Sequence, residues 1–201
     1  MTDNAKRNLG KIILYVLFVL VLLGTDQYTK RLAAVHLKGG EDFVLIKNIL
    51  SFSYLENTGA AWGVLSGKTI LFIVVTCILA VFILAVMCRL EVMKKEAGRK
   101  VYTVMQVDLA VLIAGAFGNL VDRIVNGYVV DFIKTDFINF PVFSVADCYV
   151  TISMILLIII LLCFVKEDEL DRIFFLKGKR AEARAGYQPP AGDREEKSKG
   201  E

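Results

Sequence analysis

Long uncharged apolar segments constrain the fold of this chain more than any other feature of its sequence. Residues 69–88 and 148–165 contain no charged side chain, and a helix that crosses a bilayer needs about 20 such residues. Apolar residues make up 56% of the chain, compared with ~45–50% in soluble domains. Because a backbone in lipid must satisfy its own hydrogen bonds, these segments predict membrane-spanning helices.

Two further spans carry polar residues at membrane depth. Residues 12–24 are apolar but too short to cross alone, so the span is completed by continuing to residue 36. Residues 101–121 are apolar apart from Gln106, Asp108 and Asn119. We interpret both as spanning helices whose polar positions face protein. The expected fold is therefore an all-α membrane protein with four transmembrane helices, over about 12–36, 69–88, 101–121 and 148–165.

The segments outside these spans complete the domain organisation. Residues 43–59 are rich in Val, Ile, Phe and Tyr between glycine-containing turns, a composition typical of strands. We therefore expect a small extracytoplasmic β-rich cradle over about residues 40–66, between the first and second helices. Residues 1–165 form one membrane domain, and residues 166–201 form a charged tail that is expected to be disordered beyond about Arg184.

Lysine and arginine in the connections predict the orientation of the chain. Five of them lie between the second and third spans, nine follow the last span, and Lys6, Arg7 and Lys11 precede the first. The second outer segment, residues 122–147, holds only Arg123 and Lys134, although the first outer segment carries more lysine and arginine. Since cytoplasmic loops carry the excess of positive charge, we predict that both termini are cytoplasmic.

With this topology, the polar residues of the spans gather at the outer face of the membrane. Ionisable groups at membrane depth are costly and usually functional. The residues concerned are Asp26, Asn57, Asn119, Asp122, Arg123, Asp131 and Asp147.

Paired carboxylates suggest one kind of chemistry. Two neighbouring carboxylates share a proton, so that one acts as a general base on water and the other polarises a carbonyl. His36 is the only histidine, so the chain cannot form a metal site with several histidine ligands. A Ser-His-Asp triad would depend on that one residue. Asp131 and Asp147 both have apolar neighbours, and either could hold the proton. A structural reading, with these aspartates paired to Arg123 or Lys134, is the alternative.

Four blocks of the sequence resemble the lipoprotein signal peptidases, in order across the chain up to about residue 165. They are TDQYTK (25–30), ENTGAAWGVL (56–65), GNLVDRIVNGYVVDFI (118–133) and FSVADCYV (143–150). The third block is the longest and most specific. Trp62 replaces the phenylalanine that is usual in the family, and Ser144 stands where asparagine is common, which puts one substrate contact in doubt.

The resemblance implies an aspartic endopeptidase in which Asp131 and Asp147 are catalytic. Asp26 and Lys30 lie four residues apart on one helix face, which fits a local ion pair and a direct role in the site equally well. Asp122, next to Arg123, is expected to form a structural ion pair. Small residues such as Gly59 would let a substrate chain approach closely. The residues expected to support the site or contact substrate are Asp26, Lys30, Asn57, Gly59, Asn119, Asp122, Arg123, Ser144 and Ala146.

The resemblance also implies the substrate and the location. The substrate is a prolipoprotein whose cysteine already carries diacylglycerol, cleaved just before that cysteine in the bacterial cell membrane. The expected partners are diacylglyceryl-modified prolipoproteins and membrane lipids, without nucleic acid, metal or cofactor, and the expected state is a monomer. The main alternative is a proton or ion transporter component that uses the carboxylates as a path; a metal-dependent phosphatase or transferase is a third reading.

Overall fold

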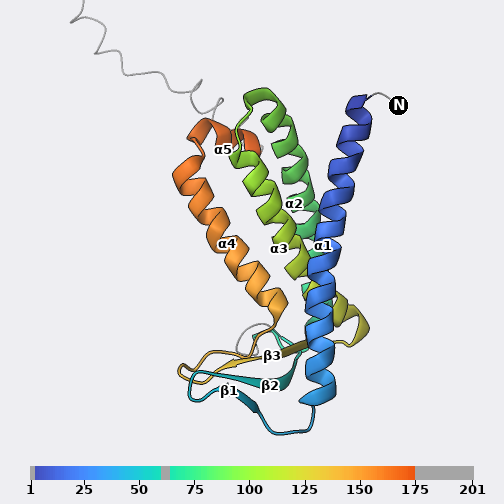
Figure 1. Cartoon of the computed structure of the whole chain (residues 1–201), viewed down its shortest axis with the longest axis vertical. Helices are drawn as coiled ribbons and strands as arrows, with labels where there is room; N and C mark the ends of the chain where they lie inside the picture. The colour runs from blue at the N-terminus through green and yellow to red at the C-terminus, as the bar shows by residue number, and fades with distance from the viewer. Residues whose placement is uncertain (1–2, 60–63, 175–201) are drawn as a thin grey trace, which may run out of the picture.

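The computed structural model describes residues 3–59 and 64–174, which form four long helices with a small sheet at one end (Figure 1). The helices are α1 (Asp3–His36), α2 (Thr69–Ala97), α3 (Val101–Val125) and α4 (Val145–Phe164). All four are long and apolar enough to cross a membrane. The predicted fold class, a helical membrane protein with four spans and a small sheet, is confirmed.

The helices extend beyond the predicted spans where charged residues continue the helical turn. The first helix begins at Asp3 rather than at about residue 12, and the second continues to Ala97 rather than ending near residue 88. Lys, Arg and Glu are good helix formers, so the helix does not stop where the apolar segment stops. Gly98, with φ of 65°, ends α2 in the left-handed conformation that glycine adopts most easily.

The sheet combines the segment between α1 and α2 with the segment between α3 and α4. Strands β1 (Phe43–Ile46) and β2 (Leu50–Asn57) lie in the predicted β-rich loop, and β3 (Val129–Thr135) comes from between α3 and α4. The three strands are antiparallel in the order β1-β2-β3. The prediction placed strands only between the first two helices and missed β3, whose pairing carries Asp131 to the end of β2, opposite Leu55.

Helix α3 is the central element and packs against all three other long helices. Two glycines let it approach its neighbours closely. A Cβ added at Gly118 would lie 2.5 Å from Asp26 Oδ2 on α1, and one at Gly115 would lie 2.6 Å from the Ala146 carbonyl oxygen on α4. Small residues at such contacts are typical of membrane helix packing, and here they bring three helices together beside the sheet.

The opposite end of the bundle is closed by a short helix that was not predicted. Helix α5 (Glu167–Ile173) lies in the charged tail, and its Ile173 is fully buried in an apolar cluster with Leu90 and Tyr102. Tyr102 Oη also donates to Glu169 Oε1 at 2.6 Å. The predicted disorder beyond about Arg184 lies outside the described residues, as does Trp62.

Candidate active site

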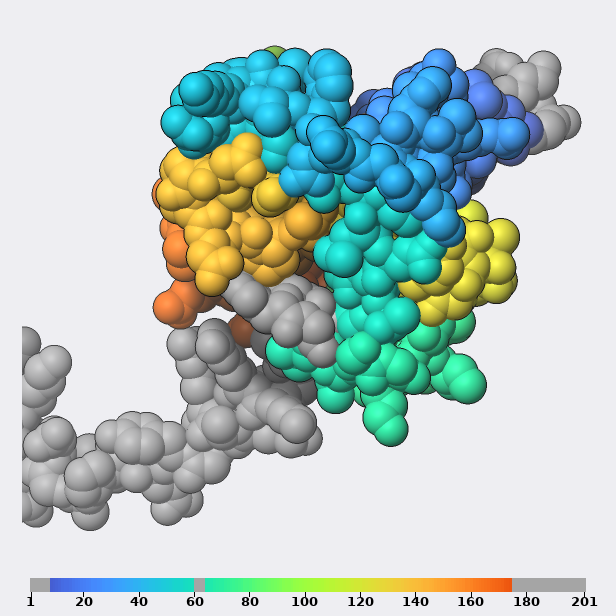
Figure 2. All heavy atoms as spheres, turned by 90° about the horizontal axis from the view of Figure 1, so that it is seen from below, coloured from blue at the N-terminus to red at the C-terminus, as the bar shows by residue number. Residues whose placement is uncertain are grey.

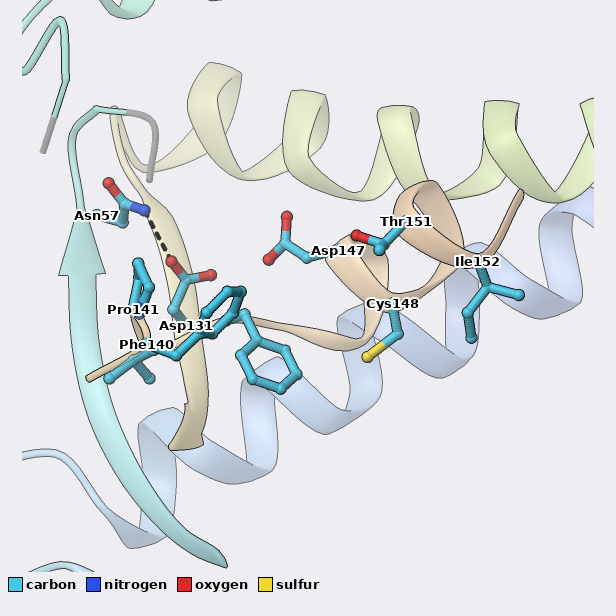
Figure 3. A pocket seen from close by; sticks show the side chains of 10 residues that line it. Asn57, Asp131, Phe140, Pro141, Asp147, Cys148, Thr151 and Ile152 are labelled. Carbon is cyan, nitrogen blue, oxygen red and sulfur yellow. Dashed lines mark hydrogen bonds between the residues drawn. The ribbon is translucent and has the colours of Figure 1, made fainter. Parts of the chain in front are cut away.

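Asp131 and Asp147, referred to below as the acidic pair, line one cavity where the sheet meets the helices (Figure 3). Asp131 lies on β3 and Asp147 in the first turn of α4, and Figure 3 shows their carboxyl groups facing each other. The cavity has a volume of about 410 Å³. Figure 2, seen from the sheet end, shows the segment between β3 and α4 beside the β1–β2 hairpin. The other lining residues are Asn57, Phe140, Pro141, Val142, Phe143, Cys148, Thr151 and Ile152.

Asp131 is held in an apolar environment, with one hydrogen-bond donor among the residues that the structure describes. Only 2% of its surface is exposed, and its neighbours Val130 and Phe132 are also buried. Its Oδ2 accepts a hydrogen bond of 2.8 Å from Asn57 Nδ2, whereas its buried Oδ1 has no hydrogen-bond partner within the described part of the chain. Burial, and then the nearby charge of Asp147, raise the pKa of Asp131 to about 7.

Asp147 has a more polar environment. Its Oδ1 accepts from Asn119 Nδ2 at 2.8 Å, and its Oδ2 accepts from the backbone N–H of Ser144 at 2.8 Å and from Ser144 Oγ at 2.7 Å. Ser144 and Asp147 form a capping box at the start of α4. The N-terminal end of a helix favours negative charge, so the position suits a carboxylate.

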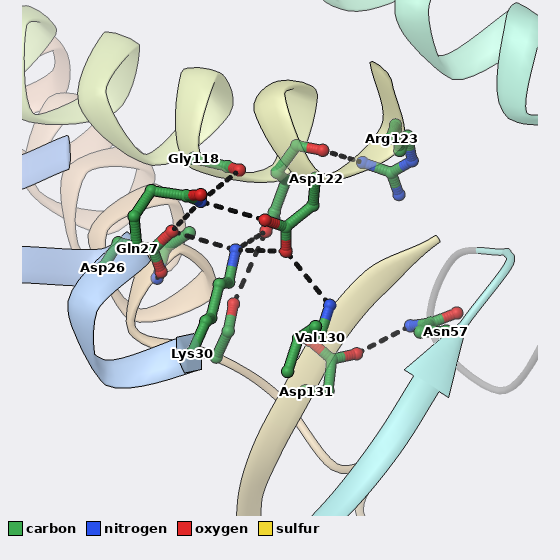
Figure 4. A network of polar contacts seen from close by, with 12 residues as sticks. Asp26, Gln27, Lys30, Asn57, Gly118, Asp122, Arg123, Val130 and Asp131 are labelled. Carbon is green, nitrogen blue, oxygen red and sulfur yellow. Dashed lines mark hydrogen bonds and ion pairs between the residues drawn. The ribbon is translucent and has the colours of Figure 1, made fainter. Parts of the chain in front are cut away.

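A buried cation lies behind the acidic pair (Figure 4). Lys30 Nζ is 2.9 Å from Asp26 Oδ2 and 3.1 Å from Asp122 Oδ2, and it donates to Asn119 Oδ1 at 2.9 Å. The predicted pair between Asp26 and Lys30 is present. The ion pair expected for Asp122 beside Arg123 forms with Lys30 instead, because adjacent residues on a helix do not face the same direction.

The two carboxylates bound to Lys30 also hold the backbone next to the acidic pair. Asp122 Oδ2 accepts from the Val130 backbone N–H at 3.0 Å, and Asp26 Oδ1 accepts from the Ala146 backbone N–H at 2.8 Å. Val130 and Ala146 immediately precede the two members of the acidic pair. Lys30 therefore connects both backbone attachments through one side chain.

Arg123 holds the end of β2. Its Nη2 donates to the Gly59 carbonyl oxygen at 3.2 Å, and its guanidinium lies 4.6 Å from the centre of the Phe72 ring, a cation–π contact. Asn57 Oδ1 accepts from the Gly59 backbone N–H at 2.9 Å. Arg123 thus fixes the turn that orients the amide facing Asp131, and it does not pair directly with either member of the acidic pair.

The structure brings the eleven predicted site residues into this one region, and it adds residues that the sequence reasoning missed. Gln27 Nε2 donates to Asp122 Oδ1 at 2.9 Å and to the Gly118 carbonyl oxygen at 3.1 Å. Its place in the TDQYTK block was the signal that could have identified it. Cys148 and Thr151 line the cavity, one helical turn apart, but nothing in their type marks them as site residues. Lys134, which the structural alternative paired with the catalytic candidates, forms ion pairs with Asp42 at 2.7 Å and Asp136 at 3.7 Å instead.

Comparison with known proteins places this arrangement in a family. Residues 18–163 match the family of signal peptidase (SPase) II. A lipoprotein signal peptidase of Enterococcus faecalis (strain ATCC 700802 / V583) is 38% identical over 151 residues, covering 75% of this chain and 89% of that protein. A lipoprotein signal peptidase of Staphylococcus aureus (strain Newman) is 40% identical over 161 residues, covering 79% of this chain and 92% of that protein.

The fold has a solved counterpart as well. A structure described as a bacterial membrane enzyme, determined by the in meso method at 2.3 Å resolution, superposes with a TM-score of 0.62 at 37% identity. The match covers 78% of this chain and 93% of that one. All three comparisons cover the same part of the molecule, which is the four helices and the sheet. The chain belongs to the signal peptidase II family and is a multi-pass membrane peptidase.

Proposed function

We propose that the acidic pair is the catalytic centre of an aspartic endopeptidase that removes signal peptides from diacylglyceryl-modified prolipoproteins, just before the lipidated cysteine. The observation that carries the proposal is that Asp131 and Asp147 face one cavity, one from the sheet and the other from a membrane helix. The relatives named lipoprotein signal peptidase support the same substrate class.

The chemistry requires one ionised and one protonated carboxyl group. The ionised member removes a proton from a water molecule, whose oxygen attacks the scissile carbonyl carbon, while the protonated member donates a hydrogen bond to the carbonyl oxygen. The proton taken from water then passes to the leaving nitrogen as the C–N bond breaks. The cavity also contacts Thr151 and Ile152 of a membrane helix, which suits a substrate held in the bilayer.

The transporter alternative is not favoured. A proton or ion path needs ionisable groups through the depth of the membrane, whereas Asp26, Lys30 and Asp122 gather at the sheet end. Asp108 is a buried acidic residue farther along α3, and one carboxyl does not make a path. Membership of a peptidase family points the same way.

Replacing either aspartate by asparagine tests the proposal. Asp131→Asn and Asp147→Asn should each reduce cleavage of a diacylglyceryl prolipoprotein by about 10²–10⁴-fold, since each removes one acid–base function, while the melting temperature of the purified protein stays near that of wild type. Asp136→Asn, just beyond β3 and away from the residues that line the cavity, is the matched control and should retain full activity. Normal turnover by either pair variant would exclude that aspartate from catalysis.

We further propose that the sheet and the acidic pair lie on the extracytoplasmic side, with both termini in the cytoplasm. The charge distribution of the connections supports this orientation. With the native cysteines replaced by alanine, Lys47→Cys, in the exposed turn between β1 and β2, should react with a membrane-impermeant maleimide in intact cells. Lys95→Cys, exposed at the opposite end of α2, should react only after lysis. The reverse pattern would invert the topology.

A further inference from the structure

The two members of the acidic pair have different sets of hydrogen-bond donors. Asp147 receives three, from Asn119 Nδ2 and from the backbone N–H and hydroxyl of Ser144. Among the described residues, Asp131 receives one, from Asn57 Nδ2. Donors that bind the charged form favour ionisation, so this arrangement stabilises a negative charge on Asp147 much more than on Asp131.

The orientation of both amides is fixed by their other contacts. Lys30 Nζ can only donate, and it lies 2.9 Å from Asn119 Oδ1, so the NH2 group of Asn119 must face Asp147. Likewise, Asn57 Oδ1 accepts from the Gly59 backbone N–H at 2.9 Å. The NH2 group of Asn57 therefore faces Asp131 Oδ2 and makes that oxygen an acceptor.

These contacts favour one position for the shared proton. Asp131 Oδ2 already accepts the amide hydrogen of Asn57, so a proton on Asp131 is placed best on Oδ1, the buried oxygen without a partner within the described residues. A neutral O–H at such a position costs far less than an unpartnered negative charge. In Figure 3 the Asp131 carboxyl oxygen that takes no hydrogen bond from Asn57 points toward Asp147, with which Asp131 lines the cavity.

We infer that Asp131 holds the shared proton on Oδ1 and that Asp147 is the ionised general base. Ser144 is a positioning residue, whose hydroxyl sets this difference between the two aspartates. This inference rests on the proposed function. It assigns a role to the serine that replaces the common asparagine. Ser144 is fully buried. Its Oγ lies 2.7 Å from Asp147 Oδ2 and 3.5 Å from Asn119 Oδ1, so its single proton goes to the carboxylate.

The other charges around the acidic pair do not supply this asymmetry through direct hydrogen bonds. Lys30 reaches Asp147 only through Asn119, and Arg123 donates to backbone carbonyl oxygens. Besides Asp147, the charges that act on Asp131 are those of Lys30 on α1 and Arg123 on α3. Arg123 also interacts with the charge of Asp122 on α3, and Cys148 on α4 interacts with the charges of Asp147 and of Asp26 on α1. Strand β2 contributes the uncharged amide of Asn57 to the cavity.

The pH dependence of activity separates the two roles. The requirement for an ionised general base gives the activity profile an acidic limb, and activity should fall on the alkaline side as Asp131 loses its proton, around pH 7, where burial and the charge of Asp147 place the pKa of Asp131. The raised pKa of Asp131 also affects the stability of the folded protein, because the fold favours the protonated form of this residue. That contribution to stability is complete below about pH 3.9, the ordinary pKa of an aspartate, and it is lost as the pH rises through about 7.

The experiment measures kcat and KM of wild type and Ser144→Ala on a diacylglyceryl prolipoprotein between pH 4 and 9. Loss of one charge-assisted hydrogen bond should move the acidic limb of the Ser144→Ala profile up by about one pH unit. The alkaline limb should stay in place, and kcat should fall while KM changes little. Ser144→Thr, which keeps a hydroxyl, should restore the acidic limb if the added methyl group fits.

Each other outcome is decisive. An unchanged acidic limb in folded Ser144→Ala would show that the serine is only a helix cap, because a structural loss lowers activity without moving the limb. A shift confined to the alkaline limb would reverse the assignment of the proton. Turnover by Asp131→Asn or Asp147→Asn, in contrast, would refute the proposed function itself.

Discussion

At the sheet end of the bundle, charged side chains are buried against one another, whereas at the opposite end the buried side chains are apolar. Asp26, Lys30 and Asp122 are at most 3% exposed. At the other end, Leu90 is fully buried in an apolar cluster, and the ion pair between Arg172 and Glu96 lies at the surface. Burying ion pairs often gives less stability than apolar packing would. The sheet end is therefore organised for geometry and charge, and the opposite end for stability.

The largest effect is expected from Lys30→Met, which removes the cation but keeps the length of the side chain. It leaves Asp26 and Asp122 buried without their countercharge. We expect a loss of about 3–5 kcal/mol in the free energy of unfolding, together with loss of cleavage activity because both backbone attachments of the acidic pair depend on these carboxylates. Denaturation in detergent and a cleavage assay measure the two effects.

A triple variant controls for the charge itself. Lys30→Met combined with Asp26→Asn and Asp122→Asn removes all three charges and should recover part of the lost stability, since no unpaired charge remains buried. If Lys30→Met alone were as stable as wild type, the contrast between the two ends of the bundle would not hold.

A smaller and purely structural effect is expected from Leu90→Ala at the opposite end. The substitution leaves a cavity beside Tyr102 and Ile173, at a cost of about 2–5 kcal/mol, while kcat at saturating substrate stays unchanged below the melting temperature. Arg172→Gln, which breaks only the surface pair with Glu96, is the control and should change neither property measurably. A change of the pH profile in Leu90→Ala would show that the two ends are coupled.

Much of the fold follows from the sequence because lipid imposes simple rules. A helix must be apolar over about 20 residues to cross a bilayer, so four spans are recognisable. Strand β3 was not predicted, because the apolar residues Val129, Val130, Phe132 and Ile133 were interpreted as the surroundings of Asp131 and not as a strand. Helix α5 is only seven residues long and charged, and its burial depends on contacts that no local pattern contains.

The sequence predicted which residues gather at the candidate site, but not which of them contact one another. The sequence places the polar residues at one end of the spans, because span boundaries fix their depth. Which groups pair cannot be read from spacing: Asp26 reaches the Ala146 backbone over 120 residues of chain, and Asp122 pairs with Lys30 rather than with its neighbour Arg123. Such pairings follow from how α1 and α4 pack on α3, which depends on close contacts such as those at Gly118.

The backbone contact between Asp26 and Ala146 links the site to the assembly of the helices in the membrane. The carboxylate belongs to α1 and the N–H group that it binds belongs to α4, 120 residues later in the chain. Before α4 docks on α1, the residues of the proposed catalytic centre are present but not aligned. Under the proposed function, peptidase activity therefore requires that these two helices have packed together in the membrane.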